Sequence, residues 1–518
     1  MASFLGMSQS QLKKNTSLLK NMVGGIFGGF YYNITAWQQL LYQLPFGKKT
    51  SKHITRIWAM DDAEFEKPKA KSSVIAYAML FLNILLSFIF FKSHKKKFES
   101  TYKNVFSEYE NKSFSSFSNQ ELIADFHKLN KDLGAKWIVP VLNGFFAFLL
   151  FSLLKKVFKK SRLRNDYPNF VNDILYSQGD VISVVIVKEF QHLVNTILSN
   201  NDLKELFNSD AETDTMKRIS VDYPDFKAQF DQYISNYGER CGDGELKIET
   251  INYKENPLSF ISVLKANAVG SVQSKKTERH FSYKKVIREK YKYSPFKKYI
   301  LLILIKATLN RIRDRENYRF YRTKGFDLVR KIFRAMDHNL YNEELINGAG
   351  DSLYLELNEL TNMDIAPDYK SIISQRKADY EIYRNKNRAN RYHQKGNNFI
   401  PAETIRLENV KDKVKGIACS SGIITAEVVI INSDKIENID ISGKILAANY
   451  FEPAWINLFS KASGIISERG GLLSHTAILC RELGIPAVVG AKGILSAIQQ
   501  GDRVQLNGET GEIQLIKV

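Results

Sequence analysis

The sequence contains few cysteines and few prolines. Its 518 residues include 11 prolines and three cysteines, Cys241, Cys419 and Cys480. Because the cysteines are odd in number and widely spaced, they exclude a disulfide framework, and their spacing matches no zinc site. With 44% hydrophobic and 12% aromatic residues, the chain has the composition of a folded protein. At this length about two to four domains are expected, and the cysteine usage favours a reducing, cytoplasmic compartment.

Three further features are missing. The first 21 residues hold no sustained apolar core and no convincing cleavage site, so no signal peptide is predicted. No nucleic-acid-binding motif is present, and no cluster of side chains has the spacing of metal ligands. We therefore expect no nucleic-acid partner and no metal or cofactor held by this chain itself.

Acidic residues are outnumbered in one part of the chain only. The sequence has 74 Lys and Arg against 55 Asp and Glu, which gives a formal charge of +19. Residues 413–518 hold 10 of each kind, so the whole excess lies in residues 1–412. A basic body favours an acidic ligand, an acidic partner or a membrane surface, although scattered lysines also serve solubility.

Residues 1–400 show helical patterning with few turn signals, and an all-α body is predicted for them. The clearest segment is 297–336, where apolar residues recur at helical spacing on a basic background. Residues 118–133 open with Ser118 followed by Glu121, which is the pattern of a capping box.

Two apolar stretches are long enough to be considered as membrane spans. Residues 74–91 and 138–154 are both followed by several lysines, but each contains an asparagine. A helix needs roughly 20 apolar residues to cross a bilayer, so both stretches are borderline in length. From hydropathy alone, membrane spans and buried core helices remain equally open.

The pattern changes beyond a polar, turn-rich segment at 391–413. We place a linker at 401–412 and a separate α/β domain at 413–518. Four short β-like runs and a closing hairpin around Asn507 and Gly508 are predicted there. The runs are 423–432, 443–449, 463–467 and 486–490, and the hairpin spans 502–516.

One helix is predicted within this domain, from about Ser474 to Leu483. A β-like run ends in Arg469, Gly470 and Gly471, and Gly484 and Pro486 follow the helix as a stop signal. His475 thus lies in the first helical turn, where free backbone N–H groups and the positive end of the helix dipole suit a phosphate.

That location gives His475 a chemical role as a phosphate carrier. The positive field lowers the imidazole pKa and keeps one ring nitrogen nucleophilic near neutral pH. The hydroxyls of Ser474 and Thr476 are expected to add hydrogen bonds, with the ring exposed. Arg481 either neutralises charge at the site or is a solvated helix residue. A histidine in a first helical turn is more often a surface or capping residue, and the other seven histidines are interpreted in that way.

The surrounding residues separate His475 from that ordinary case. Residues 467–490 resemble the signature of the mobile, or swivelling, phosphohistidine domain of the phosphoenolpyruvate (PEP)-utilising enzymes, which include PEP synthase and rifampicin phosphotransferase. The matching residues are Gly470, Gly471, Ser474, His475, Ala477, Ile478, Arg481, Gly484, Ile485, Pro486, Ala487 and Val488. The resemblance implies that His475 carries a phosphoryl group and that Gly470, Gly471, Ser474, Thr476 and Arg481 form its site.

Parts of the preceding body are similar to the helical middle region of the same family, which implies a soluble protein and favours core helices for 74–91 and 138–154. The chain starts near the expected end of the family's ATP-grasp domain. A separate ATP-grasp partner that binds ATP and Mg²⁺ is therefore implied, and this chain is expected to be inactive alone. The family-like stretches supply candidate residues for binding a small-molecule acceptor, each also interpretable as a structural ion-pair former: Arg240, Glu245, Arg315, Glu316 and Arg319.

We therefore expect a multidomain phosphotransferase component with an all-α body and a C-terminal α/β swivelling domain. Two alternatives remain open: a regulatory relative that kept the fold without turnover, and a membrane-anchored component that uses 74–91 and 138–154.

Overall fold

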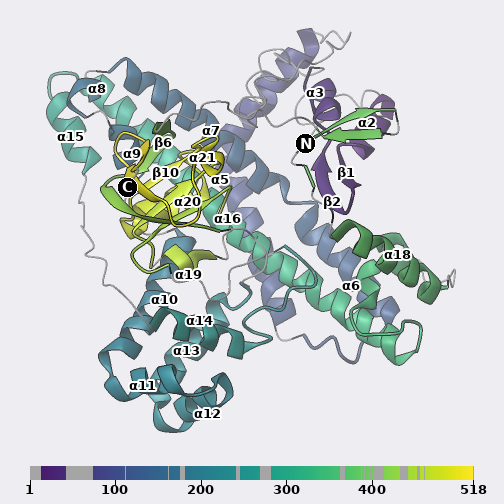
Figure 1. Ribbon diagram of the computed structural model, residues 1–518. Coiled ribbons are helices and arrows are strands. Elements are labelled where there is room, and N and C mark those ends of the chain that lie inside the picture. Colours follow the sequence, from purple (N-terminus) through teal and green to yellow (C-terminus); the bar gives the residue numbers. More distant parts are fainter. Residues whose placement is uncertain are drawn as a thin grey trace. The chain divides into compact units, whose positions relative to one another are not determined.

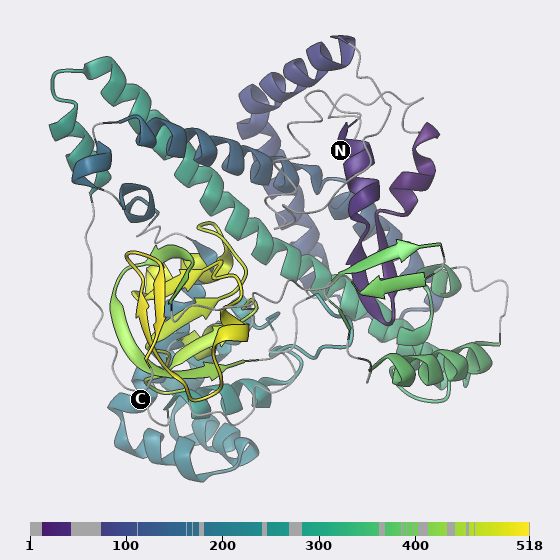
Figure 2. The ribbon, with the colours of Figure 1, turned by 45° about the horizontal axis from the view of Figure 1, so that its top comes forward.

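The computed structural model describes residues 13–42, 74–401 and 413–516, apart from 111, 162, 168, 176–180, 241–245, 269–281, 362–367, 385, 387, 390, 397, 432–440, 452–454 and 460. The chain divides into two compact units (Figures 1 and 2). Unit 1 comprises residues 1–139 and 332–403, and unit 2 comprises residues 140–331 and 404–518. The expected linker at 401–412 lies almost wholly outside the described residues, and the boundaries at 400 and 413 stay a prediction.

Unit 1 contains long helices and two β-hairpins. The capping box at Ser118 is confirmed, because its Oγ accepts from the Glu121 amide and the Glu121 carboxylate accepts from the Ser118 amide. The elements are α2 (Thr16–Lys20), β1 (Val23–Ile26), β2 (Gly29–Tyr32), α3 (Ile34–Tyr42), α5 (Val74–Glu110), α6 (Asn119–Leu129), the π-helical turn η1 (Asn130–Gly134), the 3₁₀ turn η2 (Asp351–Tyr354), α17 (Leu357–Thr361), α18 (Tyr369–Arg384), β3 (Tyr392–Lys395) and β4 (Asn398–Pro401).

The prediction that residues 1–400 are all-helical is therefore wrong in detail. Strand β1 pairs antiparallel with β2, and β3 pairs antiparallel with β4. Glycines in β1 and β2 disfavour a helix, and half-buried and exposed side chains alternate along β2, which suits a strand. The ring of Tyr31 contacts that of Tyr392 edge-on, with 5.3 Å between centroids, so the hairpins pack on one another through aromatic side chains.

The expectation of a core helix at 74–91 is also wrong for the described side chains of this stretch. Leu82, Leu85, Leu86, Phe88, Ile89 and Phe90 on α5 are exposed, and only Ser87 and Phe91 are buried. The stretch at 138–154 forms part of α7 (Ile138–Lys159) and buries one side only. In the described part of the chain, one continuous helical stretch, Asn119–Lys159, has the length and apolar character to cross a membrane, and 39% of its apolar window is buried.

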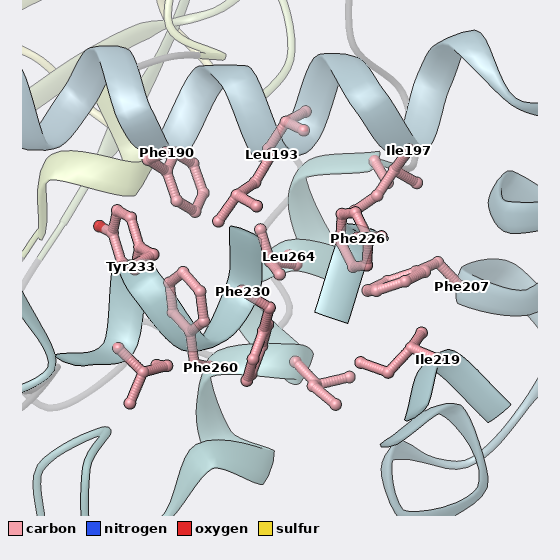
Figure 3. Packing of buried hydrophobic residues seen from close by; sticks show 14 of the residues in the cluster. Phe190, Leu193, Ile197, Phe207, Ile219, Phe226, Phe230, Tyr233, Phe260 and Leu264 are labelled. Carbon is pink, nitrogen blue, oxygen red and sulfur yellow. The ribbon is translucent and has the colours of Figure 1, made fainter. Parts of the chain in front are cut away.

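Unit 2 contains a helical part built around aromatic side chains. Its helices are α7, α8 (Leu163–Asp166), α9 (Phe170–Asp173), α10 (Ile182–Ser199), α11 (Asn201–Ser209), α12 (Glu212–Asp222), α13 (Pro224–Tyr237), α14 (Pro257–Ala268), α15 (Tyr283–Lys290) and α16 (Pro295–Asn342), with α7 and α16 continuing into unit 1. Figure 3 shows Phe190, Leu193 and Ile197 of α10 projecting toward Phe230 and Phe260. The spacing of the α10 residues places them on one helical face, so their burial fixes α10 against α13 and α14.

The C-terminal part of unit 2 is an eight-stranded sheet in the order β5-β12-β11-β7-β8-β9-β10-β6. Strands β7 to β10 run parallel, and β11, β12, β5 and β6 join antiparallel. The elements are β5 (Lys413–Lys415), β6 (Ile417–Ser420), β7 (Ile423–Ile430), β8 (Ile445–Ala448), α19 (Ile456–Phe459), β9 (Gly464–Ser467), α20 (His475–Leu483), β10 (Ala487–Val489), α21 (Ile494–Ala497), β11 (Arg503–Asn507) and β12 (Glu512–Leu515).

Alternation along the parallel strands builds two separate cores. In β8, Leu446 packs into the same cluster as Leu479 of α20, whereas Ile445 packs into a cluster that also holds Ile494 of α21. The parallel strands are thus covered on both faces, which explains why they read as continuous apolar runs. The four predicted strands, the hairpin and the helix after Ser474 are all confirmed.

The hairpin turn requires glycine at one position. A Cβ on Gly508 would lie 1.8 Å from the Ser420 carbonyl oxygen, whereas a Cβ on Gly144 in α7 would meet nothing within 4 Å. We predict that Gly508→Ala lowers the free energy of unfolding by at least about 2 kcal/mol, because backbone must shift. Gly144→Ala is expected to raise it by about 0.5–1 kcal/mol through helix propensity. Urea unfolding of both variants tests the pair, and equal stabilities would contradict the close approach.

Candidate active site

The loop between β9 and α20 is held by its own backbone and by two serines. Ser467 Oγ donates to the Arg469 carbonyl at 2.6 Å, and the Ser474 amide donates to the Gly471 carbonyl at 2.8 Å. Gly470 has φ 125°, a backbone conformation that favours glycine. Ser474 is the N-cap of α20, and its Oγ accepts from the Ala477 amide at 3.3 Å. These contacts fix the direction in which α20 begins and leave His475 as its first residue.

The His475 side chain is buried, not exposed as the sequence suggested. It is 7% exposed, and its Nδ1 lies 3.6 Å from Glu316 Oε2 on α16. Its Nε2 is buried and has no hydrogen-bond partner among the described residues. The sequence pattern that predicted an exposed ring concerns the C-terminal domain alone. In the structure, the helical part of unit 2 covers the ring.

The two side chains influence each other's protonation. Burial lowers the pKa of His475 below its ordinary value, Glu316 acts in the opposite direction, and the charges of Arg319 and Arg240 lower it further. Burial on its own would raise the pKa of Glu316, but His475, Arg315 and Arg319 together bring it down to about 2. At neutral pH the site therefore holds a neutral imidazole beside an ionised carboxylate.

This arrangement favours one tautomer of the imidazole. The ionised Glu316 carboxylate only accepts hydrogen bonds, so a proton on the facing Nδ1 is favoured. In the neutral ring the other nitrogen, Nε2, then carries the free lone pair. Glu316 thus orients the nucleophilic nitrogen away from itself.

Arg315 links the helical part to the C-terminal domain. Its Nη1 lies 2.8 Å from Glu316 Oε1 and donates to the Leu473 carbonyl, also at 2.8 Å. The guanidinium carbon lies 5.6 Å from the ring centre of Phe148, which is 44% exposed on α7. Arg319 lies one turn further along α16, with Nη1 3.8 Å from Glu316 Oε2. A cationic rim with an apolar neighbour therefore borders the imidazole.

Arg240 lies in a loop that a buried polar network anchors to α16. The Asn252 amide donates to Asp327 Oδ1 at 2.5 Å, and Arg330 donates to Asp327 and to the Lys247 carbonyl. Asn252, Asp327 and Arg330 are all almost fully buried, so each polar group needs these partners. The Tyr253 amide, next to Asn252, donates to the Arg240 carbonyl at 3.3 Å and so connects Arg240 to this network. The charge of Arg240 lowers the pKa of His475.

Arg481 is not the solvated helix residue that one interpretation of the sequence expected. It is fully buried, its Nη2 donates to the Leu472 carbonyl at 2.7 Å, and its Nη1 donates to the Cys419 carbonyl at 3.4 Å. The interpretation as a solvated residue is therefore wrong. Arg481 contacts the loop ahead of His475 and connects it to strand β6, which makes it a positioning residue in this structure.

The structure thus gathers most of the predicted residues around one imidazole. Ser474 caps the helix, Thr476 is buried in its first turn, and Arg315, Glu316 and Arg319 approach from α16. Glu245 lies outside the described residues. The catalytic and acceptor-binding roles of all these residues stay predictions. Among the described residues, no three His, Cys, Asp or Glu side chains are grouped as they would be to hold a metal ion.

Two contacts had no signal in the sequence. The side-chain amide of Asn172, on α9, donates to the Ala418 carbonyl of β6 at 2.9 Å. Leu473 packs into the helical cluster that contains Phe151 and Ile305. Asn172 is an ordinary polar residue in the sequence, and Leu473 occupies a variable position of the signature, so only the folded chain identifies them as docking residues.

Comparison with protein families identifies the class of both parts. Residues 440–511 match the mobile domain of the PEP-utilising enzymes, and residues 136–316 match the fourth domain of rifampicin phosphotransferase. The resemblance seen in the signature around His475 is confirmed, and it extends to the helices that cover that residue. The chain is thus related to the phosphotransferases of the PEP-utilising family.

Particular relatives agree with this class. Rifampicin phosphotransferase of Bacillus subtilis (strain 168) is 28% identical over 304 residues, which are 55% of this chain and 34% of that protein. A probable phosphoenolpyruvate synthase of Staphylothermus marinus is 34% identical over 121 residues, or 23% of this chain and 14% of that protein. The prodigiosin synthesizing transferase PigC of Serratia marcescens is 34% identical over 107 residues, or 20% of this chain and 12% of that protein. The matches thus span about a third or less of each relative.

The protonation states lead to a test of stability against pH. Unfolded His475 binds a proton near its ordinary pKa of 6.5, whereas the folded residue, whose pKa is lowered, binds it only at lower pH, so stability falls as the pH drops below about 6.5. The lowered pKa of Glu316 stabilises the folded state above about pH 4.5, and this stabilisation is lost only as the pH falls toward 2. Between pH 7 and about pH 5.5, we expect the urea midpoint of the wild type to fall more steeply than that of His475→Gln.

The control is His192→Gln, because His192 is exposed on α10. This variant is expected to keep the wild-type pH dependence. Equal slopes for the wild type and His475→Gln would show that His475 is not held neutral by the fold.

Proposed function

We propose that this chain carries a phosphoryl group on Nε2 of His475 and passes it to a small-molecule acceptor bound by the helical part of unit 2. The observation that carries the proposal is the imidazole at the start of α20, with Nδ1 against the Glu316 carboxylate and Nε2 without a partner among the described residues. The match of residues 440–511 to the mobile domain supports it.

In the first step, the Nε2 lone pair attacks the phosphorus of a phosphoryl donor. A P–N bond forms, the P–O bond to the leaving group breaks, and the leaving group keeps the electron pair. We propose that this donor is ATP, bound with Mg²⁺ by a separate ATP-grasp protein. Because the present arrangement buries His475, this step requires the C-terminal domain to leave α16.

In the second step, an oxygen of the acceptor attacks the phosphorus, and the P–Nε2 bond breaks with its electron pair returning to the ring. Loss of the acceptor proton to solvent completes the balance. Such a transfer depends on positioning and charge neutralisation. Arg240, Arg315 and Arg319 supply the positive charge, and the proton on Nδ1, held by Glu316, makes the imidazole a better leaving group.

The acceptor surface proposed here combines cations with apolar groups. Arg315 lies against the exposed Phe148 ring, so an acceptor with an apolar portion has a place to pack beside the guanidinium groups. The Arg319 side chain, which is about one-third exposed, extends this surface along α16. Glu245, within the family-like loop, remains a proposed contributor.

Chemical phosphorylation tests the carrier role without knowledge of the partner. Potassium phosphoramidate transfers its phosphoryl group to a nucleophilic imidazole nitrogen and releases ammonia. We expect the wild type to gain an acid-labile phosphate at His475, detected by intact mass and by ³¹P NMR, and ATP alone to give none. His475→Gln is expected to lose that label, while His192→Gln keeps it. Labelling that is equal in His475→Gln would remove His475 as the carrier.

Docking of the C-terminal domain predicts which variants accept the label faster. Asn172→Ala removes the hydrogen bond to the Ala418 carbonyl, which contributes about 1 kcal/mol to the docked state. A shift of that size raises the undocked fraction roughly fivefold, so phosphorylation of His475 by phosphoramidate is expected to accelerate about fivefold. Asn201→Ala, a change at the exposed start of α11, serves as the control. Identical rates in all three proteins would contradict undocking as the route.

The tautomer is testable directly. In ¹⁵N NMR of the imidazole, we expect His475 Nδ1 to be protonated and Nε2 to be the basic nitrogen. Glu316→Gln is expected to reduce this preference, because its amide oxygen and nitrogen present both an acceptor and donors to Nδ1. Glu427→Gln on the exposed side of β7 is the matched control. A wild-type ring protonated on Nε2 would contradict the role assigned to Glu316.

A further inference from the structure

The first turns of α16 are apolar on two opposite sides. Leu301 and Ile305 are buried in a cluster with Leu154 and Phe158 of α7. The other side carries Tyr293, Phe296, Tyr299, Ile300 and Ile303, which we call the α16 stripe; Tyr293 precedes the helix, and all five are exposed.

The α16 stripe is unusual for a surface in contact with water only. Phe296 is 76% exposed and Tyr299 is 66% exposed, and with Ile300 and Ile303 they follow the i, i+3, i+4, i+7 spacing of one helical face. Single exposed apolar side chains are common, but a contiguous row of large ones marks an interaction surface. The row lies outside the residues that surround His475.

The charge around this row has one sign. Between Lys290 and Lys306 the sequence contains no Asp or Glu. Lys290 is paired with Asp166, but no ion pair is found among the described residues for four further lysines near the stripe. These are Lys292, Lys297, Lys298 and Lys306.

The end of α7, which packs on the buried side of the same α16 turns, adds further positive charge to this region. Leu154 and Phe158 share a cluster with Leu301 and Ile305, so the last turns of α7 lie beside the first turns of α16. There is no acidic residue between Leu133 and Asn165. The exposed residues of these last turns combine apolar and basic side chains: Leu153, Lys155, Lys156, Val157, Lys159 and Lys160.

We propose that the α16 stripe docks on an anionic lipid surface, with its aromatic and aliphatic side chains in the headgroup region and the lysines of both helix ends contacting lipid phosphates. Aromatic rings flanked by lysines favour a membrane interface. Aromatic side chains lie at the level of the lipid headgroups, and the long lysine side chain extends its ammonium group toward the lipid phosphates. The row of large apolar side chains adds buried area to the electrostatic attraction. The contact is peripheral, since the opposite side of α16 stays packed on α7.

Flotation with lipid vesicles tests this surface on the full chain. The wild type is expected to float with phosphatidylcholine vesicles that contain about 30% phosphatidylglycerol, and to stay behind with phosphatidylcholine alone. Replacement of Phe296, Ile300 and Ile303 by serine is expected to lower binding by on the order of tenfold or more. The matched control replaces three other exposed apolar residues, Val221, Leu353 and Leu357, by serine and is expected to bind like the wild type.

Three results would overturn the proposal. In the first, the wild type remains in the soluble fraction in the presence of anionic vesicles. In the second, the serine variant floats as well as the wild type, which would indicate binding by charge attraction alone. Alternatively, sedimentation velocity would show a wild-type oligomer that the serine variant lacks, which would assign the stripe to self-association. Phosphorylation of His475 by phosphoramidate is expected to be unchanged in the serine variant, so this test is independent of the proposed function.

Discussion

The contact between Glu316 and His475 is the interaction on which the site depends. One carboxylate on a long helix and one imidazole at the start of a short helix meet in a buried environment, where the protonation of each is set by the other. Burial alone would raise the pKa of the Glu316 carboxyl. His475, Arg315 and Arg319 lower that pKa and keep the group ionised, and the ionised carboxylate in turn selects the proton position on the ring.

Helix α16 serves several purposes along its length. Its first turns pack on α7, its middle carries Arg315, Glu316 and Arg319, and the following turns hold Asp327 and Arg330 in a buried network that anchors the Arg240 loop. The C-terminal domain contributes backbone to its interface with the helical part, through the carbonyls of Leu473 and Ala418, and side chains, through His475 and the packed Leu473. The hydrogen bonds to the two carbonyls are directional, so they align the domain each time it docks.

The sequence predicted the C-terminal domain well because its signals are local. Alternating apolar runs, the serine cap and the glycine at the end of α20 each act over a few residues, and all appear where expected. The role of Arg481 and the burial of His475 were missed because both depend on segments distant in sequence, strand β6 in one case and α16 in the other. The hairpins of unit 1 were missed for a related reason. Strands β1 and β2 are short and contain glycines, and β3 and β4 lie in a polar, turn-rich segment, so both pairs resemble breaks between helices until their partners are known.

The burial of His475 has a consequence for the lifetime of its modified form. A phosphoramidate bond to imidazole is hydrolysed when water and a proton reach it, and the docked arrangement leaves only a small part of the side chain accessible. If the phosphorylated ring occupies the same position, hydrolysis would compete with transfer chiefly while the domain is travelling. Docking would then slow hydrolysis of the phosphoramidate bond, and the time spent undocked would set the fraction of phosphorylated chains that is hydrolysed before transfer.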